Sequence, residues 1–587
     1  MNEVWNLSVI YEGFQDPSYE ADLSSLKEKA AAYAAATAAL AEADPLEGLK
    51  SCIALEEEIT LLGGKLAEYA MLRQSADARD AQAGSQIGRV MAVVSSLAAP
   101  QAAFKDWASK LPDLMELVNS DEMLKEYTFL FENLAKSSKY LLSGQAEAVM
   151  AKLHLSGGNA WSDLHGYITS TVPVTYRGKT INLSAVRNLA YDPDPQVRKD
   201  AYDAEIACYD RIKDAAAFAL NSIKLETLSD CELRGYESPL ARTLDHANME
   251  QATLDAMLGA MDEYSPKFWQ YLKAKGKALG HENGLPWYDL FAPMGKSSTK
   301  FTTQESRDFL VEQFEGFNPD EAKMIADAFA EEWIDFFPRE GKAGGAFCAG
   351  VEAIGQSRIL TNFDGAFGDV VTLAHELGHA YHGQQIEDHA PLNLDYSMPV
   401  AETASTFNET VIMNAALDEA TDPKVKMGLL ESQLQDTTQI MCDIMSRYWF
   451  ETSVFEKCRE GFLFADDLCK LMHEAQLRGY GDGVDPETLH PYMWVCKGHY
   501  YSSHLSFYNF PYAFGGLFAA GLYAQYLREG EAFLPKYRAL LKATTVSTVE
   551  DVAKMADIDL GDVNFWRSSL EIFKARVEEF IRLAEMI

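Results

Sequence analysis

Residues 372–382 read TLAHELGHAYH, and this stretch decides the architecture around it. His375 and His379 are four positions apart, so on a helix their imidazoles share one face. Two imidazoles placed in this way can bind one metal ion, at Zn–N distances of about 2.0–2.1 Å. Glu376 follows the first histidine and could act on a water molecule at that metal without binding the ion itself. The stretch therefore predicts a metal-binding helix.

The flanking residues favour a strand, a turn and then this helix. Residues 357–363, SRILTNF, are typical of a short strand, and Asp364-Gly365 is typical of a turn. Asp369 stands where an N-cap residue would stand, before a run of apolar residues. A strand and a turn that lead into a metal-binding helix are what a zincin site requires.

A catalytic zinc usually has three protein ligands and one water molecule. The long motif H-E-x-x-H-x-x-G-x-x-H would supply the third ligand locally, but His382 and Gln385 occupy its Gly and last His positions. We expect His382 to lie beside the ligands or at the surface, because three consecutive helical ligands would crowd the metal.

The predicted third ligand is Glu402. A helix is expected to start at Pro399, and Glu402 and Glu409 would then share one of its faces. A carboxylate inside an apolar helix needs a cation or a hydrogen-bond donor, because a buried unpaired charge is costly. We therefore predict Glu402 as the ligand and Glu409 as the acceptor for a ligand histidine. The weaker candidates for the third ligand are Glu387, Asp388, His389 and Asp395.

Residues 497–516 are unusually rich in tyrosine and histidine. Both residue types can donate a hydrogen bond to an oxyanion as it develops during a reaction. The alternative interpretation is ordinary packing of aromatic side chains in a core. The local sequence pattern of residues 497–516 is compatible with both interpretations.

Three strings in order resemble the oligoendopeptidase F family, whose relatives include thimet oligopeptidase. They are TLAHELGHAYH at 372–382, AETASTFNE at 401–409 and FYNFPY at 507–512. The length of the chain and the opening around Trp5-Asn6-Leu7 fit as well, so the resemblance spans essentially the whole chain.

The resemblance implies a zinc endopeptidase for short peptides, with one Zn²⁺ per chain. It implies a mainly α fold, a large gluzincin-type frame of many helices, with a small β-sheet beside the metal helix and a deep substrate channel between two halves. Residue by residue, His375, His379 and Glu402 match the metal ligands, Glu376 the general base, and His499, Tyr508 and Tyr512 the transition-state donors. His504 competes with His499 for its role, and GGAFC at 344–348 resembles a loop near the cleft.

A chain of 587 residues exceeds what one compact core usually holds, so two or three subdomains are expected. DPDP at 192–195 separates two helical stretches. We predict an N-terminal helical part over 1–190, with a hairpin near 172–183, and a catalytic part over 191–587. Within the latter, a helix is expected to start at Asn318-Pro319 and to end at Pro338.

The net charge of −37 is unfavourable for nucleic acid and for anionic membranes, so neither is expected as a partner. The first residues resemble no signal peptide, and no membrane-spanning run is apparent. The eight cysteines show no C-x-x-C pair and are typical of reduced thiols, which indicates a cytoplasmic protein.

Two other functions remain open from the sequence. One is a carboxypeptidase or dipeptidyl carboxypeptidase on a similar helical frame. The other is an inactive peptide-binding protein, against which the intact Glu376 argues. Imidazole and carboxylate ligands would also accept cobalt or manganese.

Overall fold

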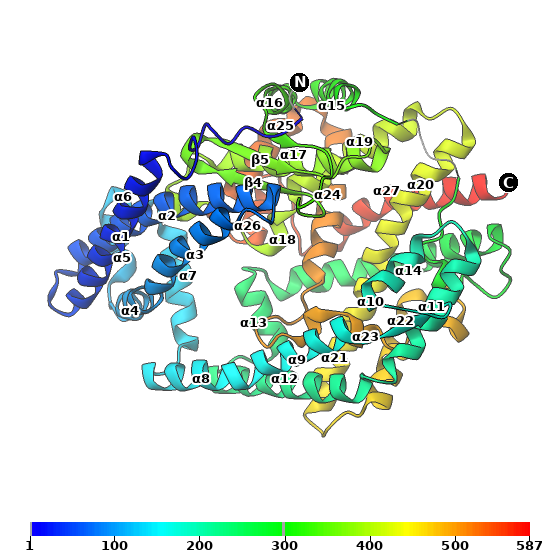
Figure 1. Ribbon diagram of the computed structural model, residues 1–587, viewed down its shortest axis with the longest axis horizontal. Coiled ribbons are helices and arrows are strands. Elements are labelled where there is room, and N and C mark those ends of the chain that lie inside the picture. Colours follow the sequence, from blue (N-terminus) through cyan, green and yellow to red (C-terminus); the bar gives the residue numbers. More distant parts are fainter. Residues whose placement is uncertain (1–2, 296–299, 587) are drawn as a thin grey trace.

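The computed structural model describes residues 3–295 and 300–586, and nearly all of its regular structure is helical (Figure 1). Two small sheets interrupt the helices. Strands β1 (Val174–Tyr176) and β2 (Lys179–Ile181) form the predicted hairpin, with Arg177 and Gly178 at positive φ in its turn. The second sheet has the order β3-β5-β4, in which β5 is parallel to β3 and antiparallel to β4. Its strands are Ile334–Asp335 (β3), Phe347–Val351 (β4) and Gln356–Leu360 (β5).

The N-terminal helices form a body with its own hydrophobic core, at the left of Figure 1. Asp16 and Asp44 each cap a helix whose first residue is proline, the arrangement that starts α1 and α2. The helices of this body are α1 (Pro17–Ala38), α2 (Pro45–Ala76), α3 (Ala81–Ser96), α4 (Ala98–Ser109), α5 (Leu114–Ser120), α6 (Glu122–Lys125) and α7 (Thr128–Ser137).

A second core joins segments far apart in the sequence. Buried residues between 172 and 223 pack there against buried residues between 450 and 501. The hydrophobic packing therefore continues across the predicted boundary near residue 190, and that boundary stays a prediction. The helices around this core are α9 (Gly158–Thr171), α10 (Leu183–Asn188), α11 (Pro195–Tyr209), α12 (Lys213–Arg234), α21 (Met445–Cys458), α22 (Ala465–Tyr480) and α23 (Met493–Cys496). The helix α8 (Gly144–Ser156) packs against α9 outside this core.

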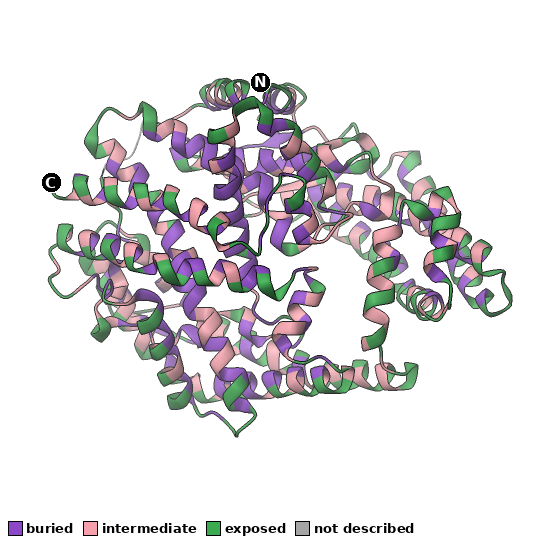
Figure 2. Ribbon diagram, turned by 180° about the vertical axis from the view of Figure 1, so that it is seen from behind, coloured by how far each residue is buried: buried purple, intermediate pink, exposed green. Residues whose placement is uncertain are grey.

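The largest core contains the metal-binding helix α17 (Phe367–Ile386), which packs against β4 and β5. Figure 2 shows buried residues concentrated on the inward faces of the helices around it. The other main helices of this core are α14 (Gln251–Ala278), α15 (Thr303–Phe317), α16 (Pro319–Ala330), α19 (Thr403–Glu419), α20 (Pro423–Thr438), α24 (Phe510–Glu529), α25 (Leu534–Ala543), α26 (Val549–Lys554) and α27 (Val563–Ala584).

The helix that starts at Pro319 ends at Ala330, so the predicted end at Pro338 is wrong. Glu332 has a φ of 60°, in the left-handed region, which reverses the chain out of the helix. The chain then enters β3, where Ile334 pairs with Ile359. The helix ends early because the chain that follows it pairs with β5, which is distant in the sequence. No local sequence pattern indicates this pairing.

One stretch, Ala81–Ser109, is long and apolar enough to cross a membrane by length and composition alone. The sequence interpretation missed it. The structure divides this stretch into α3 and α4 at Leu97, and Ala83, Val90 and Phe104 from it are buried in the N-terminal core.

Candidate metal centre and cleft

The metal-binding helix starts three residues earlier than predicted. Asp369 lies inside the first turn of α17, and the N-cap position belongs to Ala366. The Asp369 carboxylate accepts hydrogen bonds from the backbone N–H groups of Asp364 (2.8 Å) and Ala366 (3.1 Å). Its charge also lies at the positive end of the helix dipole, which is favourable. The turn before it contains Gly365 at a φ of 87°, as the Asp364-Gly365 pair predicted.

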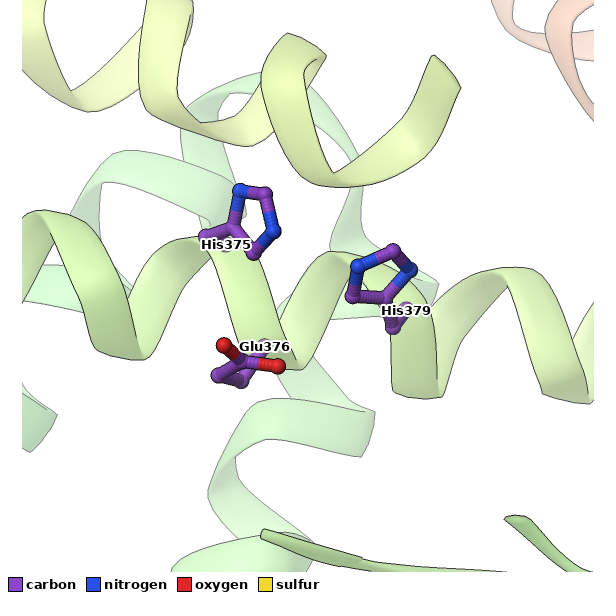
Figure 3. Close-up of side chains that lie close together, drawn as sticks. All are labelled: His375, Glu376 and His379. Atoms are coloured by element: carbon purple, nitrogen blue, oxygen red, sulfur yellow. The ribbon is translucent and has the colours of Figure 1, made fainter. Parts of the chain in front are cut away.

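His375 and His379 lie on one face of α17, one turn apart (Figure 3). Their ring centroids are 4.9 Å apart, and the ring planes are inclined by 81°. The Glu376 carboxylate points from the adjoining flank of the helix, and one of its oxygens lies within 4.8 Å of a nitrogen of each imidazole.

Glu402 joins these two histidines from another element. It lies between α18 (Met398–Ala401) and α19, with φ −95° and ψ 12°, so the helix expected from Pro399 is interrupted at this residue. Its Oε2 is 3.4 Å from His375 Nε2 and 3.3 Å from His379 Nε2. Tetrahedral ligands at about 2.0–2.1 Å from zinc are separated by roughly 3.3–3.4 Å. The three side chains therefore fit one zinc ion.

Two further contacts orient these ligands. Glu409 Oε1 is 2.5 Å from His375 Nδ1, which leaves Nε2 of the same ring directed at Glu402. Ser405 Oγ donates to Glu402 Oε2 at 2.8 Å. Carboxylates that hold the far nitrogen of a ligand histidine are common beside metals, since they set the ring orientation.

The remaining sequence candidates contact other groups. His382 is fully buried, stacks on Tyr396 at 4.4 Å and has Nε2 2.8 Å from Thr544 Oγ1. It is a core histidine, so the expected surface position is excluded. Asp388 pairs with Lys542, and His389 Nε2 contacts the carbonyl of that same lysine at 2.7 Å.

The two glutamates at the centre have opposite pKa shifts. Burial raises the pKa of Glu402, but His379, Ser405 and His375 outweigh it and hold the pKa at about 2. Burial raises the pKa of Glu376 above its ordinary value, against the opposing effect of both histidines. Glu402 is thus kept as an anion, whereas Glu376 has increased proton affinity.

Close helix packing brings Glu402 to the histidines. A Cβ added to Gly378 would lie 2.6 Å from Ser405 Cα and 2.7 Å from the carbonyl oxygen of Ala404, so α17 and α19 touch backbone to backbone at this glycine. On the other side, a Cβ at Gly515 of α24 would lie 3.2 Å from Glu402 Cβ. Gly378, inside the metal-binding motif, was the feature of the sequence that could have indicated this contact. The prediction of the site from the sequence did not use it.

A second residue missed from the sequence is Asn408. Its Nδ2 donates to the carbonyl oxygen of Ala374 at 3.1 Å and to Glu321 Oε1 at 2.8 Å. This fully buried amide links α19 to α16 and to α17. Its acceptor on α17, Ala374, directly precedes His375. Burial raises the pKa of Glu321 to about 8.

Two tyrosines approach the metal centre from α24 and the turn before it. Tyr508 and Tyr512 share a hydrogen bond of 2.6 Å between their hydroxyls. Burial raises the pKa of Tyr512 above its ordinary value, and the charge of Glu402 adds to this effect, which places the phenol within electrostatic reach of the predicted ligand. The ring of His499 lies 5.9 Å from that of Tyr508.

The hydrogen-bond network defines the tautomer of His499. Arg447, which can only donate, bonds to Asn509 Oδ1 at 2.6 Å, so Asn509 Nδ2 faces His499 Nε2 at 2.8 Å. The histidine therefore accepts at Nε2 and carries its proton on Nδ1. Burial, with Arg447 and Lys497 nearby, lowers the pKa of His499 to about 2, so the ring is neutral.

His504 lies in a different environment. Its Nε2 contacts Nε2 of His154 on α8, and Nδ1 of His154 contacts Glu226 on α12. In this conformation His499, rather than His504, lies beside Tyr508. Which of the two histidines acts on substrate stays a prediction.

Two cavities meet beside the metal centre. The first encloses about 1200 Å³ and is lined by Thr372, His375 and Glu409 among others. The second encloses about 1100 Å³ and is lined by residues from α10, α11 and the segment around Lys497. Asp436 lines both, so the two cavities lie next to each other at this residue. Of residues 344–348, the first three precede β4 and the last two belong to it, and β4 is an edge strand of the sheet against α17.

Comparisons with known proteins agree with this geometry. The family profile described as Peptidase family M3 matches residues 188–571, and the profile described as Oligopeptidase F matches residues 111–172. Oligopeptidase PepF of Bacillus subtilis is 23% identical over 92% of this chain and 82% of its own length. An oligoendopeptidase F homolog of Lactococcus lactis is 24% identical over 99% of this chain and 97% of its own length.

Solved structures share the fold. A putative peptidase from Chlamydophila abortus superposes with a TM-score of 0.88 at 20% identity, over 99% of this chain and 98% of that one. Oligoendopeptidase-F from Enterococcus faecium superposes with a TM-score of 0.71 at 18% identity, over 97% and 99% of the two chains.

Proposed function

The chain belongs to peptidase family M3, and we propose that it is a zinc-dependent oligoendopeptidase that hydrolyses internal bonds of short peptides. The observation that carries the proposal is the convergence of His375 Nε2, His379 Nε2 and Glu402 Oε2 at zinc-ligand spacing. These three side chains would hold one zinc ion per chain, and Glu409 would fix the orientation of His375.

The chemistry follows from the charges of the site. A bound zinc would lower the pKa of a water molecule from about 15.7 to about 7 and polarise the scissile carbonyl. Glu376 has a raised pKa and lies next to the ligand cluster, so it is suited to take a proton from the attacking water and return it to the leaving amine. Glu402 is too acidic for that task, which suits a ligand.

Hydrogen-bond donors for the oxyanion would come from Tyr508, Tyr512 and neutral His499. One of the two phenols donates to the other, so the second hydroxyl is free to donate to substrate, and His499 can donate from Nδ1. Removing one such donor typically lowers the rate by about 10²–10³-fold.

The cleft supports short peptides as substrates. The candidate site borders a cavity rather than an open surface, and a second cavity lies next to it, so an extended segment can enter more easily than a folded domain. We place the enzyme in the cytoplasm, which is supported by eight free cysteines.

A peptide assay tests the proposal. Fluorogenic peptides blocked at both ends should be cut by zinc-loaded protein, lose cleavage with a chelator and regain it with zinc, while a folded protein is spared. Cleavage that strictly requires a free C-terminus would favour the carboxypeptidase or dipeptidyl carboxypeptidase alternative. Binding without cleavage by zinc-loaded protein would favour the inactive peptide-binding alternative.

A further inference from the structure

The cationic side chains of the second cavity differ in whether they have a partner. Arg187 is paired with Glu205 at 2.5 Å, and Arg198 with Asp289 at 2.8 Å. Lys497 lines the same cavity, and among the cations there that the structure describes its ammonium alone makes no hydrogen bond or ion pair. The cavity therefore contains one uncommitted positive charge.

Two of the nearby carboxylates are already paired with other cations. Asp443 is bonded to Arg447, and Glu205 is occupied by Arg187 and His490. Lys497 is half-buried, and burial lowers the pKa of its amine. A partly desolvated ammonium without a partner is costly to the folded protein, so an anionic ligand would be favourable at this point.

Asp436, which lines both cavities, makes no side-chain hydrogen bond or ion pair with any described residue. Burial raises its pKa to about 7, and the charges of Glu409 and Glu431 add to that effect. It is therefore only partly ionised near neutral pH, and it leaves Lys497 available for a ligand.

The position of Lys497 relates the charge to the metal centre. It precedes His499 by two residues, and a chain spans at most about 3.3–3.6 Å per residue, so the two backbones are within about 7 Å. A peptide that runs from the metal into the second cavity would bring its end to the ammonium. Aromatic side chains line the same cavity and could pack against the last residues: Tyr191, Tyr202, Trp287, Tyr288 and Phe291.

We propose that Lys497 binds the C-terminal carboxylate of the peptide substrate in this second cavity. The inference rests on the proposed peptidase function and adds a preference to it. Peptides with a free C-terminal acid should be cut faster than the corresponding amides, at bonds a few residues from that end. A hydrogen bond to a charged group contributes enough to give roughly a 10- to 100-fold difference in kcat/KM.

The test uses one peptide in two forms, with a C-terminal acid or an amide and with a blocked N-terminus. Wild type, Lys497→Met and Lys497→Arg are compared, each loaded with zinc, and the acid-to-amide ratio of kcat/KM is measured. We expect a high ratio in wild type, a ratio near one in Lys497→Met and a partly restored ratio in Lys497→Arg. Lys110→Met, which alters a lysine paired with Asp106 on α4, should keep the wild-type ratio.

An equal rate for acid and amide in wild type would overturn the proposal. So would a Lys497→Met protein that is folded and slower but keeps the wild-type ratio, because Lys497 would then act only through His499. If zinc-loaded wild type cuts neither peptide, the peptidase proposal fails separately. Calorimetric binding of acid and amide to Glu376→Gln then still tests Lys497, since equal affinities would refute it.

Discussion

Two glutamates 26 positions apart have different tasks because their surroundings differ. Glu402 faces two imidazoles and accepts the Ser405 hydroxyl, which together keep its pKa at about 2. Glu376 lacks such a hydrogen bond among the described contacts, and burial raises its pKa. The same side chain is thus a ligand in one place and suited to be a base in the other, the division that environment commonly produces in hydrolases.

The first prediction concerns Glu376. Glu376→Gln keeps the size of the side chain and removes its ability to accept a proton, so we expect unchanged zinc content and a fall in kcat of at least about 10²–10⁴-fold. Turnover of a fluorogenic peptide and metal analysis of the same sample measure both quantities. Near wild-type turnover in the zinc-loaded variant would exclude Glu376 as the base.

At the scale of elements, the metal centre depends on the contact between α17 and α19. Gly378 faces the backbone of Ser405 so closely that any Cβ would force the two helices apart. Glu402, one residue before α19, would move with that helix away from His375 and His379.

We therefore expect Gly378→Ala to weaken zinc binding and activity by at least about tenfold, although it removes no ligand, because contacts below van der Waals distance cannot be accommodated without a backbone shift. Gly383→Ala on the same helix is the matched control, since a Cβ there meets nothing within 4 Å. Zinc competition titrations compare the two. Equal zinc affinity in both variants would show that the close contact does not position Glu402.

The buried carboxyl of Glu321, which accepts from Asn408, makes stability depend on pH. Glu321 is fully buried on α16, and its folded pKa of about 8 exceeds the ordinary value of 4.5. A carboxyl with a raised folded pKa contributes stability that is complete below the unfolded pKa and is lost as pH rises through the folded one.

Between about pH 5 and 8 the unfolding free energy of wild type should fall relative to Glu321→Gln, by roughly 1 kcal/mol per pH unit. The glutamine keeps an acceptor for Asn408 but cannot ionise. Urea unfolding of both proteins at pH 5, 6.5 and 8 gives the difference. Parallel curves for the two proteins would contradict the raised pKa of Glu321.

At the scale of the whole molecule, three hydrophobic cores divide the chain, and the three predicted metal ligands belong to elements of the largest. Ligand binding to the folded state stabilises it by mass action, about 4 kcal/mol at a concentration 1,000 times Kd. Bound zinc should therefore stabilise the core that contains α17, α19 and α24 against unfolding.

We expect a chelator to lower the Tm of one calorimetric transition and added zinc to restore it. Glu402→Ala should show a much smaller response, because the third ligand is missing. An identical Tm for metal-free and zinc-loaded wild type would argue against a zinc site among these three ligands.

Several features could be predicted because they depend on neighbours in the chain. The helical spacing of His375 and His379, and the Arg177-Gly178 hairpin turn, are local and appear as expected. Glu402 could be proposed because a carboxylate in an apolar segment needs a partner, and the structure brings it to the histidines. The end of α16 was mistaken, since strand pairing decided it. For His382 the surface alternative was wrong, because core packing buries the side chain.

The sequence by itself determined the metal-binding motif, the nearly all-helical fold and the residue types available for catalysis, because periodicity and spacing act over a few residues. Only the tertiary structure decided that α17 and α19 touch at Gly378, that Asn408 connects three helices and that Lys497 has no partner among the described residues. Each of these depends on which distant segments meet, and a chain folds so that burial and hydrogen bonding are satisfied over the whole molecule at once.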